Sequence, residues 1–357
     1  MTEKALIAMS GGVDSSVAAL LMQKRGYDCV GVTMKLFENS DVGACDDRSC
    51  CSLDDANDAG RVAHTLGIPF YIFDFSSDFR REVIDRFAKA YANGATPNPC
   101  IDCNRYIKYE RLFRRMDILG FDRLVTGHYA RIDRDGGSGR FLLKTARDAN
   151  KDQTYFLYAL TQEQLARTAF PLGSLTKAEA REIAEAAGFR NARKRDSQDI
   201  CFVRDGAYGD FIEAYTGKRC PAGNFVDASG NFLGRHRGVI RYTVGQRKGL
   251  GKAWGKPMYV TAIRPSTNEV VLGEREMLFR RELVARDVNL IASKRLADPV
   301  RVRAKIRSGR AAAPATAFQT GEDELKVIFD EPQRAVTKGQ SVVLYDGDTV
   351  VGGGVIR

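Results

Sequence analysis

The sequence predicts an α/β protein in which an N-terminal doubly wound parallel sheet is followed by a small mixed domain and a C-terminal β-barrel. Three features lead to this prediction. Strand-like apolar runs alternate with helical patterns up to about residue 130, short strands and turns follow Gly206, and the last segment carries strand patterns only. We therefore expect three domains, at residues 1–205, 206–284 and 285–357.

The first strand and helix enclose a loop rich in glycine and serine. Residues 5–9 form an apolar run typical of a buried strand, residues 10–16 are Ser-Gly-Gly-Val-Asp-Ser-Ser, and residues 17–21 begin a helical pattern. Adjacent glycines allow positive φ, and hydroxyls and free N–H groups at a helix start suit phosphate. The loop lacks the lysine of a Walker A motif and the Rossmann glycine pattern. It resembles the pyrophosphate loop of ATP pyrophosphatases, with an ordinary capped helix as the alternative.

The remaining predicted strands of this domain indicate the edge of the sheet at which a ligand would bind. Strands are expected at residues 28–34, 69–74 and 123–126, and helices at residues 53–66 and 79–91. In a doubly wound sheet ligands bind at the carboxyl ends of the strands, where the glycine loop, Met34 and Gly127 all fall. Met34 could cover an adenine ring, although core packing is the commoner use of a methionine.

The pattern changes from Tyr129 onward. Residues 131–133 and 141–144 flank a glycine-rich turn and predict a hairpin, and helical patterns follow at residues 153–160 and 177–187. The final segment predicts a small all-β unit with strands at residues 300–306, 325–329 and 341–345 and a hairpin turn at residues 346–348.

Composition excludes a membrane protein and suggests a polyanionic partner. Hydrophobic residues make up 44% and charged residues 28%, and no run of eighteen apolar residues occurs. A strand begins almost at the N-terminus, so we expect no signal peptide and a cytoplasmic location. The net charge is +10, with seven basic and no acidic residues at 234–256 and nine basic against three acidic at 281–310. These windows predict a nucleic-acid surface, with a solvated basic face as the alternative.

The cysteines suggest thiol chemistry, because structural disulfides are rare in a reducing cytoplasm. Cys100 and Cys103 form a C-x-x-C pair in a proline-rich loop before a basic helix, a setting that lowers thiol pKa. Cys201 stands alone between apolar neighbours, and on this setting alone a buried strand cysteine is the favoured interpretation. A third group comprises Cys45, Cys50 and Cys51, whose spacing does not suit a structural zinc. A two-thiol redox or sulfur-handling site fits better, and zinc remains an alternative.

Together these motifs resemble the bacterial tRNA-specific 2-thiouridylase family of the PP-loop ATP pyrophosphatase superfamily. The order and spacing of the matching segments hold from Leu6 to about Gln340. The segments are residues 10–16, 98–104 with 107–109, 127–129, 150–158, 196–202 and 243–250. The resemblance implies a PP-loop catalytic domain of the adenine nucleotide alpha-hydrolase type, a central tRNA-binding domain and a C-terminal β-barrel.

The resemblance implies adenylation of the carbon-2 oxygen of a flipped wobble uridine, followed by sulfur transfer. ATP would be bound with Mg²⁺ near Asp14, and pyrophosphate and then AMP would leave. The implied ATP-binding residues are Ala8, Met9, Ser10, Gly11, Gly12, Val13, Asp14, Ser15, Met34 and Gly127. The implied tRNA-binding residues are Asn98, His128, Lys151, Asp152, Gln153, Lys305 and Gln340. The partners would be tRNAs of the Lys, Glu and Gln type.

The resemblance also assigns the thiols. Cys201 would carry a persulfide received from a sulfur-relay protein or cysteine desulfurase, and Cys103 would resolve it through a transient Cys103–Cys201 disulfide. Some members carry aspartate where this chain has Cys100, so that carboxylate's role cannot transfer. Cys100, Cys103 and Cys201 could instead ligate an iron–sulfur cluster (4Fe-4S) that binds sulfide. A PP-loop amide-forming synthetase and a non-catalytic RNA- or nucleotide-binding module are the alternatives of other classes.

Overall fold

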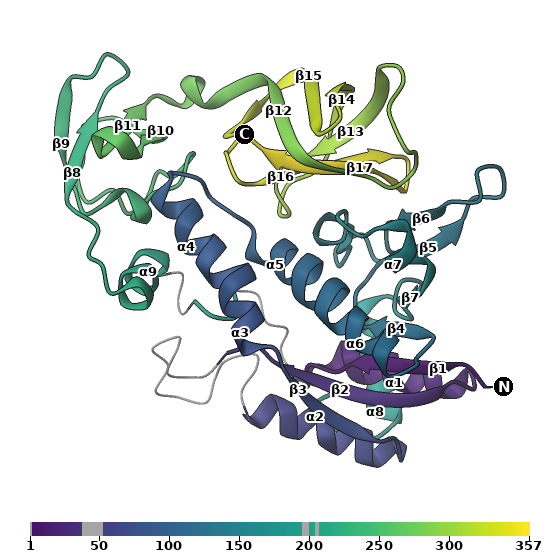
Figure 1. The fold of residues 1–357 in the computed structure, drawn as a ribbon. Helices are drawn as coiled ribbons and strands as arrows, with labels where there is room; N and C mark the ends of the chain where they lie inside the picture. The colour runs from purple at the N-terminus through teal and green to yellow at the C-terminus, as the bar shows by residue number, and fades with distance from the viewer. Residues whose placement is uncertain (1, 38–52, 195–199, 204–206) are drawn as a thin grey trace.

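The computed structural model describes residues 2–37, 53–194, 200–203 and 207–357, which form three parts (Figure 1). A parallel sheet with its helices lies at the N-terminal side, a small sheet follows, and a barrel closes the chain. The predicted architecture is therefore confirmed. Cys45, Cys50, Cys51 and residues 196–199 of the Cys201 motif lie outside the described residues. Within the described part, no helix combines the length and apolarity needed to cross a bilayer.

The parallel sheet has the strand order β3-β2-β1-β4-β7, which runs outward from β1 in both directions. All of its pairings are parallel, as the alternation of strands and helices predicted. Its strands are β1 (Lys4–Ala8), β2 (Asp28–Lys35), β3 (Phe70–Asp74), β4 (Arg123–Thr126) and β7 (Thr168–Ala169).

Both faces of this sheet are covered by helices. Ala5 and Ile7 of β1 pack on one face, and Leu6 and Ala8 pack on the other, because successive strand side chains point to opposite faces. The first face is covered by α1 (Val13–Lys24), α2 (Leu53–Leu66) and α8 (Lys177–Ala186). The second face is covered by α3 (Ser76–Phe79), α4 (Asp85–Ala92), α5 (Pro99–Asp102) and α6 (Phe113–Ile118). A short helix, α7 (Gln162–Ala166), precedes β7.

Two local predictions were wrong. The C-x-x-C pair does not precede a helix but lies within one, because α5 continues through a π-helical segment, Cys103–Leu112, into α6. Residues 153–160 are not a regular helix; they contain only the 3₁₀ turn Thr154–Phe156.

The central part is a mixed four-stranded sheet. It begins with α9 (Tyr208–Thr216), and its strands follow the order β10-β11-β8-β9. The strands are β8 (Gly223–Val226), β9 (Phe232–His236), β10 (Tyr259–Arg264) and β11 (Glu269–Gly273). Only the β11–β8 pairing is parallel.

The C-terminal part is an antiparallel barrel that docks on the first domain. Pairing of the first and last strands closes it in the order β12-β15-β14-β13-β16-β17. The hairpin of β5 (Arg131–Arg134) and β6 (Phe141–Lys144) joins it through β17. The barrel strands are β12 (Phe279–Leu290), β13 (Val300–Lys305), β14 (Ala313–Gly321), β15 (Glu324–Arg334), β16 (Ser341–Asp346) and β17 (Thr349–Ile356).

Candidate active site

The glycine loop connects the carboxyl end of β1 to the start of α1, as the sequence predicted. Gly11 has a φ of 73°, which explains a glycine at this position, whereas the φ of Gly12 is −85°. The hydroxyls of Ser15 and Ser16 each donate to the Gly12 carbonyl oxygen at 3.0 Å. The loop therefore stabilises its own turn and leaves the N-terminus of α1 open to an anion.

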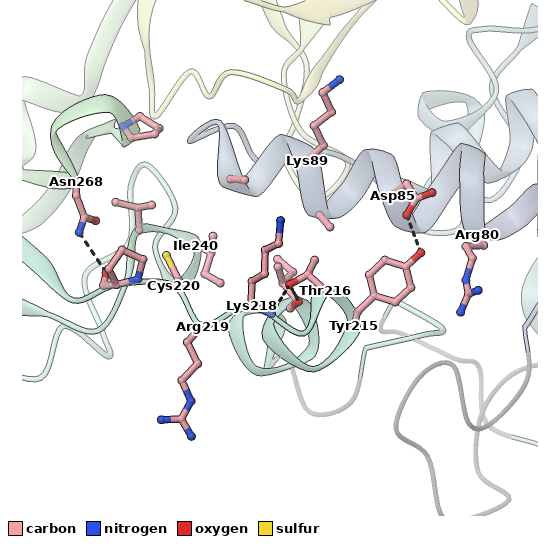
Figure 2. Close-up of a pocket in the computed structure, with 16 residues that line it drawn as sticks. Arg80, Asp85, Lys89, Tyr215, Thr216, Lys218, Arg219, Cys220, Ile240 and Asn268 are labelled. Atoms are coloured by element: carbon pink, nitrogen blue, oxygen red, sulfur yellow. Dashed lines mark hydrogen bonds between the residues drawn. The ribbon is translucent and has the colours of Figure 1, made fainter.

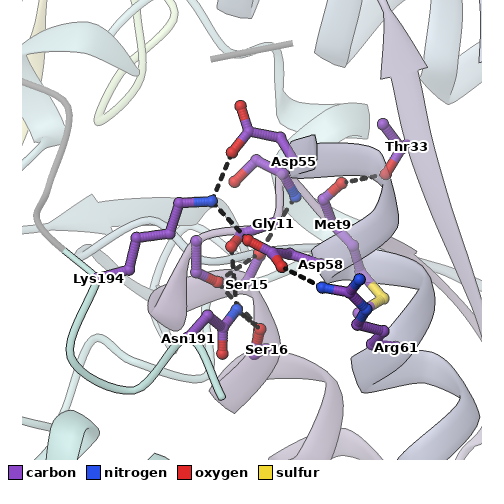
Figure 3. A network of polar contacts seen from close by, with 12 residues as sticks. Met9, Gly11, Ser15, Ser16, Thr33, Asp55, Asp58, Arg61, Asn191 and Lys194 are labelled. Carbon is purple, nitrogen blue, oxygen red and sulfur yellow. Dashed lines mark hydrogen bonds and ion pairs between the residues drawn. The ribbon is translucent and has the colours of Figure 1, made fainter. Parts of the chain in front are cut away.

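Side chains from two distant segments support this loop. Asn191 is buried, and its amide donates at 2.9 Å both to the Gly11 carbonyl oxygen and to the Ser16 hydroxyl. Lys194 lies 2.6 Å from Asp55 and 2.7 Å from Asp58 on α2, beside the same loop (Figure 3). Sequence reasoning missed these residues, because the segment 189–194 carries no motif that ties it to residues far away in the chain.

Asp14, in the first turn of α1, is ion-paired with a lysine that sequence reasoning also missed. Lys177 Nζ lies 2.8 Å from both carboxylate oxygens of Asp14. The Tyr129 hydroxyl donates to Asp14 Oδ1 at 2.9 Å. One signal was available: Thr176 and Glu179 form a capping box, which places Lys177 at the first position of α8.

The other predicted nucleotide residues lie at neighbouring strand ends. Gly127 follows β4, and a Cβ built there would lie 2.7 Å from the Ser15 nitrogen, so only glycine fits against α1. Met34, near the end of β2, is partly buried and packs against the core of the α3–α6 face. Contact of Met34 and Gly127 with adenosine stays a prediction.

The two thiols predicted to be catalytic pack against one apolar cluster. Cys103, at the start of the π-helical segment, is partly buried in this cluster, and Cys201 packs against it from the turn at residues 200–203. Phe202, next to Cys201, makes edge-to-face contacts with Phe79 and Phe87. Cys201 therefore packs against the same apolar cluster as Cys103, on the sheet face that α3–α6 cover.

The expected lowering of the Cys103 pKa is wrong. Burial raises the pKa of the Cys103 thiol, the positive charge of Lys108 lowers it in part, and the charge of Asp102 raises it further. Sequence reasoning counted the nearby cations and the helix start but had no measure of desolvation. The resting protein therefore holds Cys103 as a thiol.

The cysteines are not arranged as a metal centre. Cys100 is exposed, whereas Cys103 is partly buried one helical turn later. Within residues 2–37, 53–194, 200–203 and 207–357, no three His, Cys, Asp or Glu side chains are placed to hold a metal ion. The donor set of Cys100, Cys103 and Cys201 therefore does not fit an iron–sulfur cluster as the structure places it.

Several residues predicted to contact tRNA hold the catalytic domain to the barrel or cap its elements. Asn98 caps α5 by accepting from the Cys100 nitrogen at 3.2 Å. Gln340 of the barrel donates to the Thr96 and Pro97 carbonyl oxygens at 2.8 and 3.3 Å. These contacts fix the segment that leads into the C-x-x-C pair.

The segment 151–153 is held in a similar way. Asp152 accepts from the Ala146 nitrogen at 3.1 Å and the Thr154 hydroxyl at 2.7 Å. Gln153 accepts from the Tyr129 nitrogen at 2.9 Å, and the Lys151 nitrogen donates to the Asp148 carbonyl oxygen at 3.0 Å.

His128 and Lys305 are both affected by burial. His128 Nδ1 lies 2.7 Å from the Thr126 hydroxyl, and burial holds its pKa well below the usual range, so the ring is neutral. Lys305 lies over the Tyr155 ring at 5.8 Å. Burial lowers the pKa of Lys305, and the nearby charge of Asp152 raises it in part. A partly desolvated lysine in this position suits an anionic ligand.

A cleft of about 850 Å³ lies between α4, α9 and the central sheet (Figure 2). Four basic side chains line it: Arg80, Lys89, Lys218 and Arg219. Asp85 accepts from the Tyr215 hydroxyl at 2.6 Å within it, and Cys220 contributes to its wall. It contains none of the residues that the sequence predicted for chemistry.

Comparison with known proteins identifies the family. The family model described as the tRNA methyl transferase HUP domain matches residues 3–205. The models described as the tRNA methyl transferase PRC-barrel domain and the aminomethyltransferase beta-barrel domain match residues 209–274 and 280–356. The tRNA-specific 2-thiouridylase MnmA of Clostridioides difficile is 52% identical over 357 residues, covering 100% of this chain and 99% of the relative. The chain belongs to the tRNA-specific 2-thiouridylase family.

A second 2-thiouridylase, from Lachnoclostridium phytofermentans, is 51% identical over 355 residues and aligns over 99% of both chains. The resemblance found in the sequence motifs is therefore confirmed. The three-part fold of this 2-thiouridylase family member agrees with the sheet, mixed domain and barrel that the sequence predicted.

Proposed function

We propose that this chain uses ATP to adenylate the wobble uridine of tRNA and then transfers sulfur to carbon 2 from a cysteine persulfide. The tRNA 2-thiouridylase activity follows from full-length membership of the family. That alignment is the observation that carries the proposal. All three domain models are described by methyl or aminomethyl transfer, but the near-full-length relatives are thiouridylases, and paired thiols suit sulfur transfer.

ATP is assigned to the glycine loop and the open N-terminus of α1. The helix start and the Gly-Gly backbone suit the phosphates, and Met34 and Gly127 would line the adenosine side. Mg²⁺ commonly uses one or two carboxylates together with substrate phosphates, and Asp14, whose carboxylate is paired with Lys177 in this structure, would supply one. When bound, Mg²⁺ would neutralise phosphate charge beside Asp14.

The sulfur transfer uses two cysteines of the protein and one external reductant. The terminal sulfur of a Cys201 persulfide attacks carbon 2 of the adenylated uracil, and AMP leaves with the former carbonyl oxygen. Cys103 then loses its thiol proton to solvent and its sulfur attacks Cys201 Sγ, which breaks the S–S bond, leaves sulfur on the base and forms a Cys103–Cys201 disulfide. Two electrons from cellular thiols reduce that disulfide, as expected in a cytoplasm.

The burial of Cys103 supports this order of events. A buried thiol with a raised pKa resists oxidation before the substrate arrives, because the thiolate is the reactive form. Since the three cysteines do not form a metal centre, no step is assigned to an iron–sulfur cluster. The persulfide donor is a sulfur-relay protein or cysteine desulfurase, and the RNA partners are wobble-uridine tRNAs of the Lys, Glu and Gln type.

The tRNA would be bound by the barrel and by residues 151–153. Lys305, partly desolvated over Tyr155, would contact phosphate, and the basic residues of 234–256 and 281–310 would position the anticodon arm. Asn98, His128 and Gln340 border the thiol helix and would surround the flipped base.

The proposal is tested by measuring 2-thiouridine and pyrophosphate with ATP, tRNA and a persulfide donor. Cys201→Ser and Cys103→Ser should both abolish thiolation, whereas pyrophosphate release should persist, because adenylation needs neither thiol. Cys220→Ser, a partly buried cysteine in the cleft of Figure 2, is the matched control and should thiolate normally. Thiolation by Cys201→Ser at the wild-type rate would refute the persulfide route, and a lack of pyrophosphate release by the wild type would refute adenylation.

A further inference from the structure

Lys108 is a cation on the helix that carries Cys103, and it has no role in the reaction proposed above. It lies in the π-helical segment that begins at Cys103. In a π-helix each backbone N–H bonds to the carbonyl five residues earlier, so this segment aligns residue 108 with residue 103. In an α-helix residue 108 would lie about 140° around the axis from residue 103. The π-helical register therefore places Lys108 on the face of the helix that carries the thiol.

The charge of Lys108 acts on two buried groups of this site. Burial raises the pKa of the Cys103 thiol, and the charge of Lys108 lowers it in part. Burial lowers the pKa of His128, and the same charge lowers it further. The Thr126 hydroxyl lies 2.7 Å from His128 Nδ1 and 3.2 Å from the hydroxyl of Tyr109, the residue after Lys108. Cys103, Lys108 and His128 therefore form one cluster, in which His128 is neutral and the lysine carries the positive charge.

The Lys108 ammonium is not neutralised by a neighbouring carboxylate. In the part of the chain that the structure describes, its side chain forms no ion pair and no hydrogen bond. Glu110, two residues further on, lies 3.9 Å from Arg111 instead. The one carboxylate that acts on the Cys103 thiol within the described residues is Asp102, whose charge raises the thiol pKa. A half-buried lysine in this setting is available to an anion that forms beside it.

We propose that Lys108 is a positioning residue that stabilises the Cys103 thiolate while Cys103 resolves the persulfide on Cys201. This inference rests on the proposed role of Cys103 in sulfur transfer. When Cys103 loses its proton to solvent, the negative charge develops beside the ammonium. The sulfur electron pair then forms the bond to Cys201 Sγ, and the S–S bond of the persulfide breaks. The thiol thus stays protonated at rest but ionises more readily than burial alone would permit.

The pH dependence of Cys103 alkylation tests this inference without using the catalytic reaction. The protein is treated with iodoacetamide between about pH 7 and pH 9, where the rate follows the thiolate fraction. Tandem mass spectrometry separates the half-buried Cys103 from the exposed Cys100. Lys108→Met should slow Cys103 alkylation about tenfold across this range, because loss of a nearby cation raises the thiol pKa by about one.

Two further variants control for charge and for fold. Lys108→Arg keeps the charge and should be alkylated within about threefold of the wild type. Arg114→Met is the matched control, since it removes an exposed cation from α6, further along the same continuous helix. It should leave the alkylation profile unchanged. In the tRNA assay, Lys108→Met should slow thiolation and leave pyrophosphate release at the wild-type rate, because adenylation does not use the thiol.

The outcomes separate this inference from the proposed function. If Cys103→Ser thiolates tRNA as the wild type does, the resolving role fails and this inference fails with it. If Cys103→Ser is inactive but Lys108→Met is alkylated at the wild-type rate, only this inference fails. Loss of pyrophosphate release in Lys108→Met with unchanged alkylation would overturn it in favour of a lysine that binds ATP or tRNA. Thermal unfolding checks each fold, and Lys108→Gln replaces Lys108→Met in the same assays should the latter unfold.

Discussion

The two glycines of the nucleotide loop differ in the room that each leaves for a side chain. A Cβ at Gly11 would lie 2.3 Å from the Asp55 carbonyl oxygen, and the residue has a φ of 73°. A Cβ at Gly12 would meet only the Ser10 hydroxyl at 3.6 Å, and its φ is −85°. Gly11→Ala must therefore adopt a left-handed backbone and push α2 away, whereas Gly12→Ala needs neither change.

The two substitutions should differ clearly in stability. For Gly11→Ala the left-handed backbone costs about 1–2 kcal/mol and the overlap with α2 about 1–3 kcal/mol, so unfolding free energy falls by roughly 2–5 kcal/mol. In a domain of this size the melting temperature falls by about 2–4 °C for each kcal/mol of lost stability, so it should fall by roughly 4–20 °C. Gly12→Ala should melt within about 2 °C of the wild type or slightly higher, because it stiffens only the unfolded chain.

At Gly12 we expect the substitution to weaken ATP binding even though it leaves stability unchanged. This residue directly precedes α1, where the phosphates are proposed to approach the backbone, so an added methyl group intrudes on the ligand. We expect Gly12→Ala to bind ATP at least about tenfold more weakly while its melting temperature is unchanged. Gly26→Ala is the control for backbone conformation, since Gly26 has a φ of 85° with no atom within 4 Å of a built Cβ. It should lose only about 1–2 kcal/mol.

Two results would refute this reasoning. If Gly11→Ala melts no lower than Gly26→Ala, the contact between the loop and Asp55 is not a tight one. If Gly12→Ala binds ATP as the wild type does, the phosphates do not lie on this loop. Differential scanning fluorimetry and calorimetric titration with ATP measure the two quantities independently.

Two further predictions concern buried polar groups. Burial raises the pKa of Asp102 to about 7, above its unfolded value, so its contribution to stability is present below about pH 4 and is lost as pH rises toward 7. Asp102→Asn should therefore raise unfolding free energy by about 2–4 kcal/mol at pH 8 but hardly at pH 4; equal shifts in urea titrations at both pH values would contradict this. Asn191→Ala removes both donors to Gly11 and Ser16 and should cost about 1–3 kcal/mol, and Asn191→Asp, which cannot donate, should melt no higher than Asn191→Ala.

The parallel sheet could be predicted from the sequence because its signal is local. The apolar run of β1 and the helical pattern after it fix strand, loop and helix without knowledge of the rest of the chain. The same local logic failed at residues 153–160, where aromatic and leucine spacing suggested a helix. There the Tyr155 hydroxyl donates to the Ser341 carbonyl oxygen at 2.9 Å, and Asn289 donates to the carbonyl oxygens of Tyr158 and Leu160. Contacts with the barrel therefore replace the backbone bonds that a helix would need.

The candidate site was predictable only in its motifs. The glycine loop, Cys103 and Cys201 are visible in short stretches of sequence, but their surroundings are not. Desolvation of Cys103 depends on side chains from several helices, and it reverses the pKa shift that the local cations suggested. Lys177 and Asn191 reach the loop from 163 and 180 residues away, and a single sequence carries no information on such pairings.

The nucleotide loop and the two thiols pack against opposite faces of the same sheet. Met9 and Val13 of the loop segment belong to the core of the α1, α2 and α8 face, whereas Cys103 and Cys201 pack against the core of the α3–α6 face. The two sets can meet only at the carboxyl edge of the strands, because the sheet itself separates them elsewhere.

Residues 127–129, directly after β4, connect these two halves. Gly127 abuts the first turn of α1, and the Tyr129 hydroxyl bonds to Asp14 in that turn. His128, between them, packs against Tyr109 of the π-helical segment Cys103–Leu112. Because alternate residues of this short segment contact the nucleotide loop and the helix that carries Cys103, the segment fixes the position of the loop relative to that helix.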